Sequence, residues 1–181
     1  NAMKIGIDLG TTNSALAWMD PSDDDQTIQV FEIPQFVAQG RQESLRTLPS
    51  FLYLGDQNYV GAYAREQGAL TPTRTVHSAK SWLSNPDVDR RAKILPWDTQ
   101  ESARELSPVE VSAKYLAHMR EAWDAAHPDH PLAQQDIVLT VPASFDEEAR
   151  ELTVEAAREA GLENLTLLEE PAAAFYSWIA N

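Results

Sequence analysis

The chain has 181 residues, of which 43% are hydrophobic, enough for one compact domain that buries roughly two-thirds of its unfolded surface. Its 28 acidic and 14 basic side chains leave a net charge of −14, which disfavours nucleic acid and anionic membranes as partners. Cysteine is absent and no apolar run is long enough to span a membrane, which excludes thiolate chemistry and fits a cytoplasmic location.

The first half of the chain predicts mainly β-strands. Segments rich in apolar and β-branched residues, joined by turn-forming residues, predict an antiparallel meander of three strands at 4–9, 14–19 and 28–33. A further strand is expected at 48–54, and short helices are expected at 62–70 and 76–83. In residues 85–106 the apolar residues show neither helical nor strand-like spacing. Residues 1–3 are interpreted as a tag remnant followed by the native start.

The second half of the chain alternates helices and strands. Ser107, Pro108 and Glu110 form the capping pattern of a helix start, and an apolar face with helical spacing follows. Ser144 and Glu147 predict a second capped helix. The elements expected after the first helix are a strand at 136–141, a helix from 144 that ends at 161, a strand at 165–168 and a helix from 171. Two consecutive strand–helix units predict parallel pairing of their strands.

This order of elements predicts an α/β fold with a mixed sheet, a three-strand meander followed by parallel strands. The same order is shared by the ribonuclease-H-like half-domains of the actin-type ATPases. Residues 4–33 and 107–181 would form the core of such a half-domain, and residues 34–106 would form an inserted α/β subdomain.

The clearest chemical signal follows the first strand. Asp8 lies near the end of this strand, and the chain then turns through Gly10 to offer the amides and hydroxyls of Thr11 and Thr12, followed by Asn13. A nest of backbone amides can bind the terminal phosphates of a nucleotide, and a carboxylate opposite them can hold hydrated Mg²⁺. An ordinary hairpin with a buried aspartate is the alternative. The spacing and terminal Lys-Ser/Thr of a P-loop are missing.

These residues resemble a known family. The run Ile-Asp-Leu-Gly-Thr-Thr-Asn-Ser resembles the first phosphate signature of the DnaK-type (seventy-kilodalton heat-shock) chaperones. Four later segments resemble the same family in the same order: 48–51, 79–80, 141–150 and 170–174. The resemblance runs from residue 4 to about residue 178 and implies that the chain is the first lobe of the ATP-binding domain.

The resemblance implies a role for each matching residue of the nucleotide site. Gly10, Thr11, Thr12 and Asn13 would bind the phosphates of ATP or ADP. Asp8 and Glu170 would order Mg²⁺ through water, and Lys80 would orient the attacking water; these three are the predicted catalytic residues. Taken alone, Lys80 is a typical surface lysine, and Glu170 is a favourable charge at a helix start.

The resemblance also implies a relay between the nucleotide site and a peptide-binding domain, formed by Pro142 and Arg150. Taken alone, Pro142 is a strand terminator and Arg150 a cation on a helix surface. The chain departs from the family pattern at Glu169, where the family usually has asparagine, and at residues 81–83. Both departures predict a divergent branch of the family.

The intact protein is expected to hydrolyse Mg-ATP slowly and so control its binding of unfolded client peptides, together with co-chaperones. The second phosphate loop, the second lobe and the peptide-binding domain are expected beyond residue 181. The chain is therefore predicted to be a fragment that does not hydrolyse ATP alone. A metabolite (sugar) kinase and a non-enzymatic actin-like scaffold of the same superfamily are the alternatives.

Overall fold

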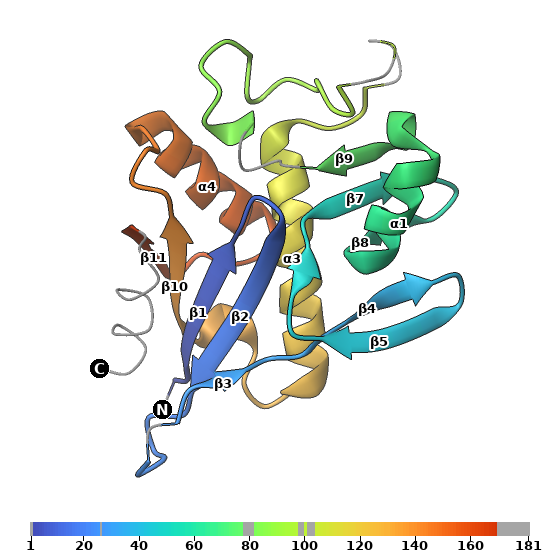
Figure 1. Ribbon diagram of the computed structural model, residues 1–181. Coiled ribbons are helices and arrows are strands. Elements are labelled where there is room, and N and C mark those ends of the chain that lie inside the picture. Colours follow the sequence, from blue (N-terminus) through green and yellow to red (C-terminus); the bar gives the residue numbers. More distant parts are fainter. Residues whose placement is uncertain (1, 26, 78–81, 98–99, 101–103, 170–181) are drawn as a thin grey trace.

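The computed structural model describes residues 2–25, 27–77, 82–97, 100 and 104–169. Its main feature is a six-stranded mixed sheet with the order β11-β10-β1-β2-β3, to which β6 is added alongside β2 (Figure 1). The strands are β1 (Lys4–Leu9), β2 (Asn13–Met19), β3 (Gln29–Val30), β6 (Leu48–Pro49), β10 (Asp136–Val141) and β11 (Leu165–Glu169). β1 pairs with β2 in antiparallel fashion and with β10 in parallel, and β10 pairs in parallel with β11. The predicted mixed sheet is confirmed.

Two long helices, α3 (Pro108–Ala126) and α4 (Glu147–Glu159), lie behind this sheet in the view of Figure 1. Ile5, Ile7 and Leu9 of β1 belong to the same buried cluster as the inward residues of both helices. Because successive side chains of a strand point to opposite faces, Asp8 faces away from the helices. The alternation of β1 thus separates its apolar residues from its carboxylate.

The capping pattern predicted for α3 is confirmed. The amide of Glu110 donates to the Ser107 hydroxyl at 3.1 Å, and the amide of Ser107 donates to the Glu110 carboxylate at 3.0 Å. The two bonds satisfy two amides that a helix start would otherwise leave without partners.

The predicted capping residue of α4 was wrong by two positions. The cap is Asp146, not Ser144, and its carboxylate accepts the amide of Ala149 at 2.8 Å. Residues between Pro142 and Phe145 form a turn instead, in which the Phe145 amide donates to the Pro142 carbonyl at 3.1 Å. Gly161, at φ +90°, follows the end of α4 as predicted.

The segment between β3 and α3 forms two smaller sheets. One is the hairpin of β4 (Ile33–Ala38) and β5 (Arg41–Leu45), and the other has the order β8-β7-β9. The remaining elements are β7 (Phe51–Leu54), β8 (Asn58–Val60), α1 (Ala62–Leu70), β9 (Thr75–His77) and the short 3₁₀ turns Pro72–Arg74 and Leu132–Gln134. None of the helices in the described part of the chain combines the length and apolar character that a membrane crossing needs.

Three predicted elements in this region were wrong in extent or type. The strand expected at 28–33 is divided, because β3 ends at Val30 and β4 begins at Ile33; between them the Phe31 ring packs against Trp123, with ring centroids 5.3 Å apart. The strand expected at 48–54 is divided between two sheets, because β6 pairs with β2 whereas β7 pairs with β8 and β9. The helix expected at 76–83 begins instead as strand β9, residues 78–81 lie outside the described residues, and residues 82–83 are helical as expected.

Candidate functional site

Asp8 lies where the parallel strands β1 and β10 run side by side. Its Cα partner in the register is Thr140, and the Thr140 hydroxyl donates to the Asp8 carboxylate at 2.9 Å. Thr140 is buried, and Asp8 is half-buried. One carboxylate oxygen is therefore held by the neighbouring strand, which fixes the direction in which this carboxylate points.

The turn that follows Asp8 is held from one side by Ser50. The Ser50 hydroxyl donates to the carbonyl of Gly10 at 2.8 Å, and the Ser50 amide donates to the carbonyl of Thr12 at 2.9 Å. In a trans peptide the carbonyl and the following N–H point in opposite directions. The amides of Thr11 and Asn13 are consequently directed away from Ser50. Two backbone amides therefore lie on the side opposite Ser50, where they can donate to an anion.

Gly10 is needed at this turn for steric reasons. A Cβ atom at this position would lie 2.1 Å from the carbonyl oxygen of Asn13, far inside contact distance. The turn therefore closes on itself more tightly than any side chain permits. Thr11, Thr12 and Asn13 are all exposed residues.

Ser50 itself is held by buried contacts. Its hydroxyl lies 3.3 Å from the hydroxyl of Ser14, and its carbonyl accepts the Tyr115 hydroxyl at 3.1 Å. Burial raises the pKa of Tyr115, so the phenol keeps the proton that it donates. The turn is thus supported from α3 through Tyr115 and Ser50.

Sequence reasoning did not assign a role to Ser50 or Thr140. Ser50 lies within the 48–51 match to the chaperone family, and this is the signal that could have identified it. The signal for Thr140 is a hydroxyl within the otherwise apolar strand 137–141. Both residues lie far from the turn in sequence, which is why local patterns did not connect them to it.

The two predicted relay residues, Pro142 and Arg150, lie on either side of the connection between β10 and α4. Pro142 directly follows β10, and Arg150 lies in the first turns of α4, where its Nε donates to the Phe145 carbonyl at 3.5 Å. The Arg150 guanidinium also forms an ion pair with Glu169, the last residue of β11. The structure therefore connects the turn after β10, the start of α4 and the end of β11.

Glu169 lies on the helix side of the sheet. Leu165 and Leu167 of β11 pack against the cluster that α3 and α4 share, and Glu169 follows them at the same spacing of two residues. Asp8 faces the other side. The carboxylate at which the chain departs from the chaperone pattern is therefore paired with Arg150 and not placed beside Asp8.

Two of the predicted catalytic residues, Lys80 and Glu170, lie outside the described residues, so the structure does not test their position. Within the described part of the chain, no group of three or more acidic or histidine side chains is arranged to hold a metal ion.

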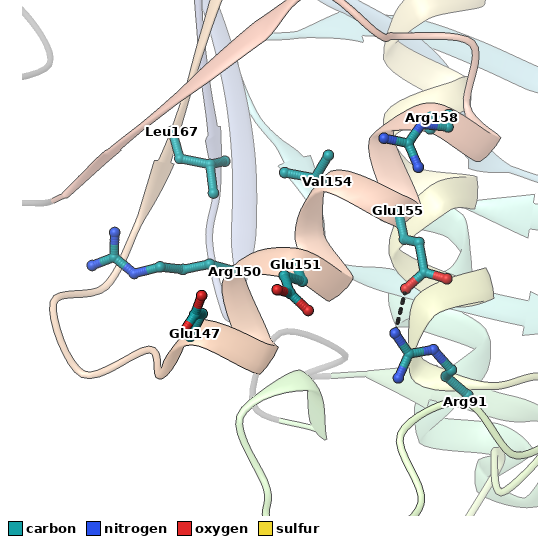
Figure 2. A pocket seen from close by; sticks show the side chains of 8 residues that line it. All are labelled: Arg91, Glu147, Arg150, Glu151, Val154, Glu155, Arg158 and Leu167. Atoms are coloured by element: carbon teal, nitrogen blue, oxygen red, sulfur yellow. Dashed lines mark hydrogen bonds and ion pairs between the residues drawn. The ribbon is translucent and has the colours of Figure 1, made fainter.

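A pocket of about 460 Å³ lies on the outer side of α4 (Figure 2). It is lined by Val154 and Leu167 together with three arginines and three glutamates: Arg91, Arg150, Arg158, Glu147, Glu151 and Glu155. This pocket lies on the helix side of the sheet, whereas Asp8 faces the opposite side. It is therefore a separate feature from the predicted nucleotide site.

The fold and the turn define an α/β domain that places a tight, amide-rich turn and a carboxylate at the end of a mixed sheet. Comparison with known families agrees with this class, because the sequence pattern of the Hsp70 protein family matches residues 4–178. The chain belongs to the Hsp70 family, and its sequence lies in the N-terminal ATPase region of that family.

Individual relatives cover nearly all of this chain. It is 36% identical to a chaperone protein HscA homolog of Cupriavidus necator, over 95% of this chain and 27% of the relative. It is 34% identical to the chaperone protein DnaK of Deinococcus deserti, over 96% of this chain and 27% of that relative. It is 32% identical to a mitochondrial-type heat shock protein 70 of Encephalitozoon cuniculi, over 94% of this chain and 29% of that relative. The chain thus spans less than a third of the length of these relatives.

Proposed function

We propose that this chain is the first lobe of the nucleotide-binding domain of an ATP-dependent molecular chaperone. In this proposal residues 4–33 and 107–181 form the ribonuclease-H-like core of the lobe, as in actin-type ATPases, and residues 34–106 form its inserted subdomain. The family membership and the names of the relatives, all chaperones or heat shock proteins, support the proposal.

The observation that carries the proposal is the turn braced by Ser50. Its carbonyls at Gly10 and Thr12 are both engaged on one side, so the amides of Thr11 and Asn13 are available on the other. Two backbone amides on one side of the turn, together with the hydroxyls of Thr11 and Thr12, fit the terminal phosphates of ATP or ADP, and Gly10 adds no Cβ at the tightest point of the turn. A hairpin with a purely structural role does not need its peptide planes held in this direction.

Asp8 is suited to help hold Mg²⁺ through water. Oxygen ligands are those that Mg²⁺ prefers, and Asp8 keeps a half-buried carboxylate whose orientation Thr140 fixes. Glu170 is proposed as the second carboxylate of this site. When bound, Mg²⁺ would neutralise charge on the phosphates. The net charge of −14 makes such local neutralisation necessary, because the chain as a whole repels nucleotides.

The remaining roles concern the intact protein. Lys80 is proposed to orient the attacking water and to stabilise charge that develops during hydrolysis. Pro142 and Arg150 are proposed to pass the state of the nucleotide site to a peptide-binding domain, which would bind unfolded client peptides with the help of co-chaperones. Cytoplasmic location stays a prediction.

Single-turnover ATP hydrolysis by the full-length parent protein, with and without an unfolded peptide, tests this function. Slow hydrolysis that speeds up with peptide is the expected result. Turnover that appears only when a sugar is added would instead identify a metabolite kinase. Nucleotide binding without any response to peptide or sugar would identify an actin-like scaffold.

The Lys80→Ala variant of the parent sharpens the test. We expect hydrolysis to be nearly abolished while ATP still binds, because the lysine is proposed to act on the attacking water. Equal loss of binding and hydrolysis would make Lys80 an affinity or structural residue.

A further inference from the structure

Arg90 is a charged side chain that is almost completely buried, with 6% of its surface exposed. One of its terminal nitrogens donates to the carbonyl of Leu83 at 2.7 Å, and the other donates to the carboxylate of Glu148 at 2.9 Å. The first of these nitrogens also lies 3.5 Å from the carboxylate of Asp146, the capping residue of α4. A single guanidinium therefore joins a backbone carbonyl of the inserted segment to the start of α4.

Neighbouring residues attach the same segment to the helices from outside. Arg91 donates to Glu155 of α4 at 2.9 Å, as the dashed line in Figure 2 shows. Lys93 lies 3.2 Å from Glu110 at the start of α3. The side chains of Arg91 and Lys93 are both largely exposed, and exposed ion pairs contribute little to the free energy of folding. Arg90 differs from them in its burial, and its bond to the Leu83 carbonyl is buried, whereas the bond from Lys93 to the Glu105 carbonyl is exposed.

The two points that Arg90 joins are close in sequence to residues of the proposed mechanism. Leu83 follows Lys80 by three positions. Asp146 directly follows the turn of Pro142 and lies four positions before Arg150. A displacement at either end would pass through Arg90 to the other, because a buried arginine with fixed acceptors has few alternative positions.

We propose that Arg90 is a positioning residue that couples the inserted segment around Leu83 to the first turn of α4, and so to the Pro142–Arg150 relay. This inference rests on the proposed function for its consequence in catalysis. Its structural content, that the two segments move together through Arg90, does not depend on that function.

The charges around Arg90 make the proposal testable with folded variants. Asp146 and Glu148 keep 58% and 51% of their side-chain surfaces exposed. If Arg90 is replaced by methionine, water can therefore solvate both carboxylates, and the uncharged side chain still fills most of the volume. Arg90→Met also removes the donor of the buried Leu83 carbonyl, which costs stability. Glu148→Gln leaves that bond in place and removes only one charged partner, so it provides a second variant that keeps the fold intact.

The test compares three variants of the full-length parent: Arg90→Met, Glu148→Gln and Arg91→Met. We expect Arg90→Met to reduce single-turnover hydrolysis, and its acceleration by unfolded peptide, by about tenfold, with ATP affinity within about twofold of the wild type. Glu148→Gln is expected to show a smaller loss of the same kind. Arg91→Met, the matched exposed arginine, is expected to remain within about twofold of the wild type in all three measurements.

Hydrogen exchange provides a readout that does not require activity. In Arg90→Met, amides at 83–90 and at 146–150 are expected to exchange faster together, whereas Arg91→Met leaves both unchanged. Wild-type exchange in both segments, or a loss of ATP affinity as large as the loss of hydrolysis, would overturn the proposal. A wild-type parent without peptide-stimulated hydrolysis would instead contradict the proposed function, and the exchange result would still decide the role of Arg90.

Discussion

The turn after β1 and the start of α4 are assembled by different kinds of contact. At the turn, Ser50 binds the carbonyls of Gly10 and Thr12 with neutral groups, and Ser50 is buried. At the start of α4, a buried guanidinium on Arg90 meets carboxylates that remain about half exposed. The turn therefore depends on close steric fit, whereas the start of α4 depends on charge that water can partly replace.

This difference predicts how each region responds to substitution. The partly buried Gly10 carbonyl keeps much of its desolvation cost when it loses its donor, whereas an exposed carboxylate that loses its partner is solvated again. Changes at the turn are therefore expected to cost more stability than changes at α4. Changes at α4 are expected to act mainly on communication between segments.

The largest effect is expected for Gly10→Ala. The new Cβ would meet the Asn13 carbonyl at 2.1 Å, so the turn must open, and we expect the free energy of unfolding to fall by about 2–3 kcal/mol. Urea denaturation of the 181-residue chain measures this loss. Gly40→Ala is the matched control, because Gly40 has a φ of +73° but open space around it; about 1 kcal/mol is expected there. Equal losses would show that the turn is not sterically closed.

The second-largest loss of stability is expected for Ser50→Ala. The variant leaves the partly buried carbonyl of Gly10 without its side-chain donor, which we expect to cost about 1–2 kcal/mol in unfolding free energy. ATP affinity of the parent should fall as well, because the peptide planes of the turn are no longer held. Ser44→Ala, at an exposed position of β5, is the control and should leave both quantities unchanged. Unchanged ATP affinity in Ser50→Ala would show that the bond from Ser50 to the Gly10 carbonyl is not needed for nucleotide binding.

A smaller effect on stability is expected for Glu169→Asn. The side chains of Arg150 and Glu169 are 34% and 53% exposed, so loss of their ion pair should change the free energy of unfolding by less than about 1 kcal/mol. The response of ATP hydrolysis to peptide should increase, because Arg150 is released for the proposed relay. Glu163→Gln, an exposed glutamate before β11, should change neither quantity. A large loss of stability would instead identify the pair as structural.

The smallest effect at neutral pH is expected for Asp146→Asn, because asparagine also caps helices well. The amide of Ala149 lowers the pKa of Asp146, and the charge of Arg90 acts in the same direction. Because the folded pKa lies below its usual value, the stabilisation is complete at neutral pH and is lost as pH falls below about 4. Melting temperatures across this range should fall less for Asp146→Asn than for the wild type. Asp129→Asn, in an exposed turn, should follow the wild type.

Local patterns predicted much of the main sheet and both long helices. The alternation of β1, the capping residues Ser107 and Glu110 and the glycine after α4 each act within a few residues, so they are readable without the fold. The cap of α4 was placed at Ser144 because Ser144 and Glu147 have the right spacing. In the structure the cap is Asp146, whose carboxylate also forms an ion pair with Arg90.

The sequence by itself determined the mixed sheet, the carboxylate at Asp8 and the tight turn at Gly10, together with the resemblance to the family. Only the tertiary structure decided that residues 48–54 divide between two sheets at Ser50, and that Arg90 reaches α4. Ser50 lies 40 positions from Gly10 and Arg90 lies 58 positions from Glu148. Contacts at such separations depend on how whole segments pack, and no local period or capping rule encodes them.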